Sequence, residues 1–246
     1  MRTDGSKPTT LAPETSTPLF DVGDHSAPKE RHLKPSYKFD AKNVVTLLVG
    51  PEKHSMIVHS NYLARTSEFF ASALKKEWAE GQTRTIGLDE ETPELIAHYL
   101  DWMYTTGLPT KECWPWDPQG SKTAANDLLA ELYVLGERRL DSQLRNAIIA
   151  EFIRHREPLH DVARCSSFQR AGAINIIYQG TPPGSAARRL MVDLSFRSGC
   201  PRCYTADELD KAFLVDLTQI FFAAIHEPKS IEKQRLPVPR AEDYQV

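Results

Sequence analysis

The chain has 246 residues but only four cysteines, too few and too scattered for the disulfide framework of a small secreted protein. Long apolar runs are also lacking: no stretch approaches the roughly 20 consecutive apolar residues of a membrane-spanning helix. The polar N-terminus does not contain the apolar centre of a secretion signal. We therefore expect an intracellular protein, in the cytoplasm or the nucleus, that does not interact with a membrane.

An excess of positive charge is missing as well. The chain has 30 Lys and Arg against 33 Asp and Glu, a formal net charge of −3. Proteins that bind nucleic acid usually concentrate Lys and Arg to neutralise the phosphates, so this composition does not indicate a nucleic-acid partner. A hydrophobic content of 41% is sufficient for a folded core.

Motifs of catalysis or metal binding are equally scarce. Cys200 and Cys203 form a C-x-x-C pair, but no second such pair follows to complete the tetrahedral ligand set of a structural zinc site. His155 and His160 have Pro158 between them, and nothing in the pattern fixes their geometry. We interpret the two thiols as part of a turn and His59 as a hydrogen-bonded structural residue. The sequence predicts no catalytic residue, no cofactor, no metal and no enzyme activity.

Both ends of the chain are predicted to be disordered tails. Residues 1–36 carry five prolines among Ser, Thr and charged residues, with few apolar side chains to bury. Residues 227–246 are predicted to be the second tail.

The rest of the chain is organised around the stretch 43–109. A β-branched and aliphatic run, Val44–Val49, stops at Gly50-Pro51 and resumes at Met56-Ile57-Val58, which predicts a β-hairpin. A further short strand is predicted at Thr85–Leu88.

Two helical segments flank this last strand. Ser60 is predicted to cap the first segment and Gly81 to end it. Thr92 is predicted to cap the second, with Pro93 in the first turn, where a missing N–H has no cost. The expected apolar positions are Leu63, Phe69, Phe70 and Leu74 in the first segment, and Leu95, Ile96, Tyr99, Leu100 and Met103 in the second.

These residues carry a resemblance to the BTB/POZ domain. The matching positions are Ile57-Val58-His59, Leu63, Ser67-Glu68-Phe69-Phe70, Leu88, Pro93 and Tyr104-Thr105-Thr106-Gly107. Asn43 and Ser60 stand where the family usually has Asp and Lys. The resemblance implies an α+β fold over residues 37–156, in which a small mixed β-sheet is flanked by a helical cluster.

An all-helical C-terminal extension is predicted at residues 157–226. Before it, Thr123 is predicted to cap a helix, and Asp141 or Ser142 the next one. The inward positions of these two helices are Leu128, Leu129, Leu132, Leu135 and Leu140, then Leu144, Ile148 and Phe152. In the extension itself, the expected apolar stripe is Leu209, Phe213, Leu217, Ile220, Phe221 and Ala224. Part of the extension, residues 173–193, resembles the corresponding region of BTB proteins from filamentous fungi.

Four residues are candidate partner-binding residues. Trp78 and Glu80 lie where BTB members that recruit cullin-type ubiquitin ligases have a hydrophobic-x-Glu motif; the alternative is that Trp78 packs within its own domain. Trp114 and Trp116 lie in a Pro- and Gly-containing loop, where they either form a partner-binding lip or fold back onto the domain.

The resemblance therefore implies a protein–protein interaction module. We expect an adaptor that links a partner protein to a cullin-type ubiquitin ligase through the BTB domain, so the partners are a cullin scaffold or another BTB domain. One alternative is a homo-oligomeric scaffold, including a homodimer, without a ligase role. The other is a transcription-associated regulator, although the chain has no zinc-finger pattern or basic stripe.

Overall fold

The computed structural model describes residues 43–109, 121–154, 171–198, 209–226 and 240–246. All of them lie in one compact unit, residues 39–246. The predicted tail 1–36, the loop with Trp114 and Trp116, and the pair Cys200 and Cys203 lie outside the described residues.

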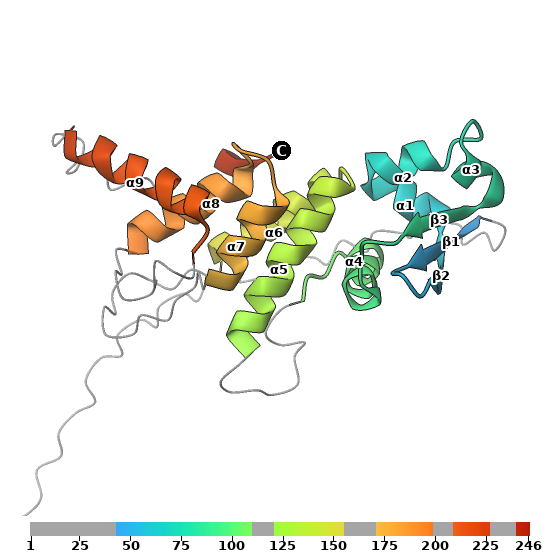
Figure 1. Cartoon of the computed structure of the whole chain (residues 1–246). Helices are drawn as coiled ribbons and strands as arrows, with labels where there is room; N and C mark the ends of the chain where they lie inside the picture. Colours follow the sequence, from blue (N-terminus) through green and yellow to red (C-terminus); the bar gives the residue numbers. More distant parts are fainter. Residues whose placement is uncertain (1–42, 110–120, 155–170, 199–208, 227–239) are drawn as a thin grey trace, which may run out of the picture. The chain divides into compact units, whose positions relative to one another are not determined.

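A three-stranded mixed sheet occupies the first described range (Figure 1). Strands β1 (Val44–Val49) and β2 (His54–His59) form the predicted antiparallel hairpin, and β3 (Thr85–Leu88) pairs with β1 in parallel, so β1 lies in the centre. Gly50 takes a φ of 72° in the hairpin turn, a conformation that favours glycine. Alternate residues of β1 are buried, which is the pattern of a strand with one face on a core.

The first helical segment is broken into pieces, contrary to our prediction of one capped helix. Helix α1 (Ser60–Thr66) stops at Ser67, whose backbone is extended and whose side chain accepts a hydrogen bond from the Phe70 amide to start α2 (Glu68–Ala73). Ser60 is not the cap; its hydroxyl donates to the Asn43 carbonyl. Serine side chains that bond to nearby backbone groups favour helix ends over helix interiors, so Ser67 explains the break between α1 and α2.

Gly81 was also predicted incorrectly, because it lies inside a third short helix, α3 (Ala79–Thr83). That helix ends at Arg84, which adopts the left-handed conformation with a φ of 55°.

Helix α4 (Pro93–Thr105) begins as predicted, with the Thr92 side chain accepting a hydrogen bond from the Leu95 amide at 3.2 Å. Its buried residues are Ile96, Tyr99, Trp102 and Met103. Leu95 and Leu100, which we predicted to face inward, are only half-buried and pack at the edge of the core. The predicted helical period was correct, but the buried face of α4 is centred on Tyr99 and Trp102 rather than on the leucines.

Helices α5 (Ser121–Arg138) and α6 (Ser142–Arg154) form the predicted helical hairpin. Helix α5 starts two residues before Thr123, so Thr123 is not its cap. Leu140 is exposed rather than inward, because it is in the turn between the helices with a φ of 52°. Asp141 starts α6 as predicted: its carboxylate accepts a hydrogen bond from the Leu144 amide at 2.9 Å.

The C-terminal region is helical, and this completes the predicted fold class. It contains α7 (Ala171–Gly180), α8 (Ala186–Ser198) and α9 (Lys211–His226). Within the described residues no helix is both long enough and apolar enough to cross a membrane.

The prediction of a disordered tail at residues 227–246 is wrong for its last part. Ala241–Tyr244 form a short 3-10 helix, η4, and the Tyr244 ring is buried. Its hydroxyl donates a hydrogen bond to Asp193 of α8, and the Asn146 side chain of α6 accepts one from the Val246 amide at 3.1 Å. The buried Tyr244 ring and these two hydrogen bonds attach this end of the chain to α6 and α8.

Buried polar contacts connect the turn between α5 and α6 to the elements that precede it. The Tyr99 hydroxyl of α4 donates to the Asp141 carboxylate at 3.1 Å, and the Ser67 hydroxyl donates to the Arg139 carbonyl. The Arg139 guanidinium also lies 2.8 Å from the buried carboxylate of Glu91. We refer to Glu91, Tyr99, Arg139 and Asp141, together with Ser67, as the polar hub.

The charge on Asp141 makes a pH-dependent contribution to stability. Burial raises the pKa of the Asp141 carboxyl above its ordinary value of 3.8, against hydrogen bonds from Leu144 and Tyr99 that lower it. An acid with a higher pKa in the folded than in the unfolded state destabilises the fold as the pH rises through that interval.

We therefore predict a pH-dependent difference between the parent and Asp141→Asn, which keeps an oxygen for the Leu144 amide but carries no charge. Relative to this variant, the parent should lose stability as the pH rises from 3.8 to the raised pKa, and the difference should then stay constant. Urea unfolding at a series of pH values measures it. A difference that does not change with pH contradicts the prediction.

Candidate protein-interaction site

Trp78 lies in the segment that connects α2 to α3, and backbone hydrogen bonds fix its position. Its amide donates to the Lys75 carbonyl at 3.1 Å, and its own carbonyl accepts from the Gln82 amide at 3.1 Å. The Gln82 side chain donates to the Lys76 carbonyl, also at 3.1 Å. We call residues 74–84 the Trp78 segment.

Gly81 allows α3 to pack closely against the start of this segment. A Cβ atom at Gly81 would lie 2.0 Å from the Lys75 carbonyl oxygen, a distance at which the backbone must move. The other end of the segment is attached to the sheet, because the Arg84 carbonyl accepts from the Thr46 amide at 2.9 Å. The Arg84 guanidinium donates to the Ser60 hydroxyl at 3.2 Å. The Trp78 segment is therefore a closely packed turn that is held at both ends.

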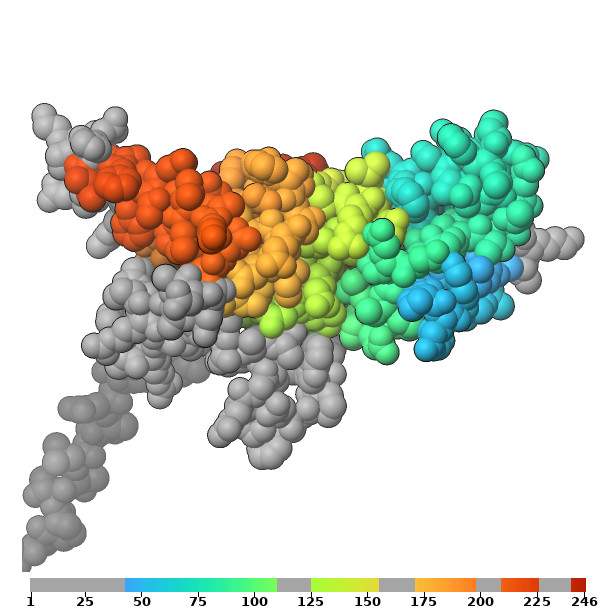
Figure 2. Space-filling model, in the orientation of Figure 1, coloured from blue at the N-terminus to red at the C-terminus, as the bar shows by residue number. Residues whose placement is uncertain are grey.

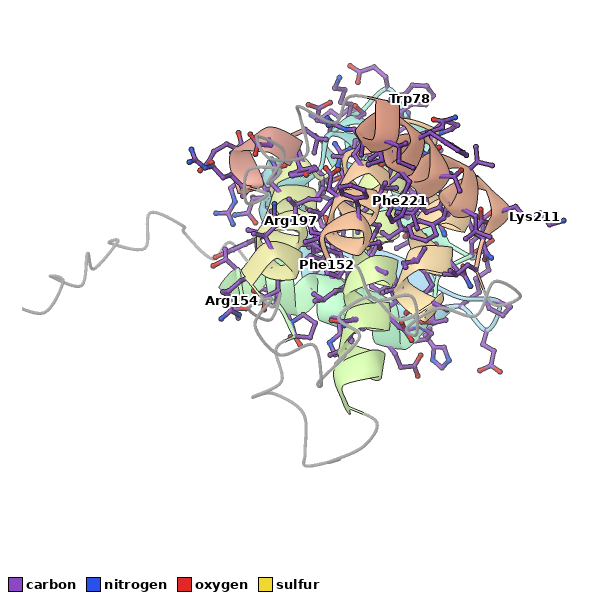
Figure 3. The ribbon with its side chains drawn as sticks, turned by 90° about the vertical axis from the view of Figure 1, so that its left-hand side faces the viewer. Trp78, Phe152, Arg154, Arg197, Lys211 and Phe221 are labelled. Carbon is purple, nitrogen blue, oxygen red and sulfur yellow. The ribbon has the colours of Figure 1, made fainter. Side chains whose placement is uncertain are left out.

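The Trp78 side chain itself is 58% exposed (Figure 3). This exposure favours an interface role over the alternative that Trp78 packs on its own domain. Lys75, Lys76 and Glu77 are exposed beside it, and Glu80 is half-buried. Among the described residues, no ion pair involves Glu80. An exposed tryptophan with charged neighbours has the composition of a small interface, with an aromatic centre and a polar rim.

The other residues singled out from the sequence are not brought to this site. Trp114 and Trp116 lie outside the described residues, as do Cys200, Cys203, His155 and His160. Among the side chains that the structure describes, no three of His, Cys, Asp or Glu gather as a metal site requires. His59 is hydrogen-bonded as predicted: its amide donates to the Tyr104 hydroxyl at 3.1 Å, and its Nδ1 lies 3.0 Å from the same oxygen.

Sequence reasoning missed two further exposed apolar positions. Ile57 of β2 is 73% exposed, although it lies in the middle of an apolar triplet. Phe222 of α9 is exposed. Phe221, which we predicted to face inward in the apolar stripe, is 43% exposed, so the prediction is wrong for this residue. The adjacent pair Phe221-Phe222 was the available signal, since neighbouring residues of a helix are about 100° apart and cannot both face the centre of one core.

We predict that two substitutions in the Trp78 segment differ in their effect on stability. Gly81→Ala should lower the free energy of unfolding by about 1–3 kcal/mol, because the new methyl group overlaps the Lys75 backbone. Trp78→Ala should change it by less than about 0.5 kcal/mol, as expected for an exposed side chain. Urea denaturation of both variants gives the values; a loss of about 3 kcal/mol for Trp78→Ala would show that the ring stabilises the core.

Comparison with known protein families identifies the domain that contains this site. Residues 40–151 match the family model of the BTB/POZ domain. No curated protein matches the chain. The chain thus contains a BTB/POZ domain, as its resemblance implied, followed by a helical region. BTB/POZ domains mediate protein–protein interaction and oligomerisation, and the family is generally non-enzymatic.

Proposed function

We propose that this protein is an adaptor that binds a cullin-type scaffold through the Trp78 segment of its BTB/POZ domain. The observation that carries the proposal is the exposure of Trp78, 58%, in a segment whose backbone is fixed by hydrogen bonds. A segment whose backbone is already fixed loses less conformational entropy on binding than a mobile one.

Glu80 has the secondary role in this proposal. It follows Trp78 by two residues, as in the hydrophobic-x-Glu motif, and it is half-buried. A charge at the rim of an interface acts mainly on the rate of association and is screened by salt. Trp78 should therefore supply most of the affinity and Glu80 a smaller part that depends on ionic strength.

The proposal requires an intracellular protein, in the cytoplasm or the nucleus. It leaves the helices after residue 156 to bind or position the second protein that the adaptor delivers. The resemblance of residues 173–193 to BTB proteins of filamentous fungi remains a prediction.

We predict that Trp78→Ala weakens binding to a purified cullin N-terminal region by at least about 2 kcal/mol, the usual range for a hot spot. Glu80→Ala should have a smaller effect that fades as salt is added. Calorimetric titration of the full chain, with a thermal melt of each preparation, measures affinity and folding together.

Ile57→Ala is the matched control for this experiment. It also removes an exposed apolar side chain from the BTB/POZ domain, but from β2 rather than from the Trp78 segment. Its affinity should equal that of the parent. A parent that does not bind cullin, or a Trp78→Ala variant that binds as tightly as the parent, rules out the adaptor function and favours the homo-oligomeric scaffold.

A further inference from the structure

Helix α9 has two apolar faces, and the first packs on the protein. Phe213, Leu217, Ile220 and Ala224 follow one another at steps of four, three and four residues, and all are buried or half-buried. The Phe213 ring meets the edge of Tyr178 at a centroid distance of 5.4 Å. The Tyr178 hydroxyl donates to Asp216 at 2.9 Å. This face fixes α9 on α7 and α8.

The second face carries Val215, Thr218, Phe222 and Ile225, which we call the outer seam. Their steps are three, four and three residues, the spacing by which one helix packs against another in a coiled coil. All four are exposed, Phe222 at 63% and Ile225 at 64%. Part of α9 lies open at the surface in the space-filling view (Figure 2).

Phe221 closes one side of the outer seam. Its ring meets Phe196 of α8 at a centroid distance of 4.9 Å and an interplanar angle of 64°, and Phe221 is still 43% exposed. The contact with α8 limits the movement of Phe221, which is labelled in Figure 3, before any partner binds.

The outer seam is also free of charge. No Asp, Glu, Lys or Arg occurs from Leu217 to Ile225, and Asp216 is engaged by Tyr178. Lys211, at the start of α9, extends away from the ribbon (Figure 3). A charged partner would lose hydration on this face without gaining an ion pair. The suitable occupant is an uncharged helix with the same three-four spacing, and the chain itself provides one in α9.

We propose that the outer seam of α9 is a helix–helix interface between two copies of this chain. Around a twofold axis each seam covers the other, and like charges are not brought together along it. Val215, Phe222 and Ile225 of the seam, together with Phe221 beside it, are four exposed apolar side chains. At about 100 Å² each they would bury about 800 Å² in the pair, below the roughly 1,200 Å² of a stable interface. The dimer is therefore expected to be weak and reversible.

This interface is separate from the proposed cullin site. Helix α9 follows the BTB/POZ match, which ends at residue 151, and shares no residue with the Trp78 segment. Trp78→Ala should leave self-association unchanged, and Phe222→Glu should leave the cullin affinity of each subunit unchanged. Failure of one proposal can thus be distinguished from failure of the other.

Sedimentation velocity of the full chain over a concentration series from about 1 to 500 μM tests the interface. The parent should associate as its concentration rises. Phe222→Glu and Ile225→Glu should each raise the dissociation constant at least about 30-fold, because each places an unpaired carboxylate in an apolar contact. Both side chains are exposed in the monomer, so the circular dichroism and the thermal midpoint should stay unchanged.

Ala223→Glu is the matched control. It adds the same charge one residue from Phe222, at an exposed position turned about 100° around the helix, and it should associate like the parent. If a second interface exists, the outer-seam variants should remove one association step and keep the other. The proposal is overturned by a parent without concentration-dependent association, by outer-seam variants that associate like the parent, or by an equal loss in Ala223→Glu.

Discussion

The polar hub connects the turn between α5 and α6 to the α1–α2 junction and to α4. Residues from three earlier elements meet this turn: Ser67 at the junction of α1 and α2, Glu91 before α4, and Tyr99 within α4. Each hydrogen bond contributes only about 0.5–1.5 kcal/mol on balance, but a buried group left without its partner costs about 1–3 kcal/mol. The hub therefore makes one arrangement of these elements more stable than arrangements that leave its buried groups without partners.

The exposed apolar side chains are carried by rigid parts of this framework. Trp78 is held by the backbone of a closely packed turn, and the outer seam of α9 by the aromatic contacts of Phe213 and Phe221 behind it. Exposed aromatic residues on a mobile segment would bind weakly, because ordering them costs conformational entropy. Here the folded protein has already ordered the backbone that carries them, and this agrees with a protein that acts by binding other proteins.

Sequence patterns predicted the parts of the fold that depend on neighbours in the chain. The hairpin at Gly50, the Thr92 cap and the Asp141 cap each rest on a few adjacent residues whose chemistry leaves little choice. The exposure of Trp78 could not be predicted in the same way, since it depends on how α3 packs against Lys75 through Gly81. The motif marked the residue, and only the packing around it showed that the ring faces solvent.

The errors arose where distant contacts override local pattern. Leu140 continues the apolar period of α5, yet the turn that brings Asp141 to Tyr99 places it in solvent. Tyr244 lies in a polar segment with no period at all and is buried by Asp193 and Arg189 of α8, the latter with its guanidinium 5.8 Å from the ring centre. No local pattern could predict that Tyr244 contacts these α8 residues, because they are about 50 residues away in the sequence.

The central claim is that the Trp78 segment is a binding surface for a cullin-type scaffold, and hydrogen exchange of the full chain with and without that scaffold tests it most directly. We predict slower exchange in peptides from residues 74–84 when the scaffold is present, and no change in peptides from α9. Unchanged exchange throughout residues 74–84 at saturating scaffold would contradict the account.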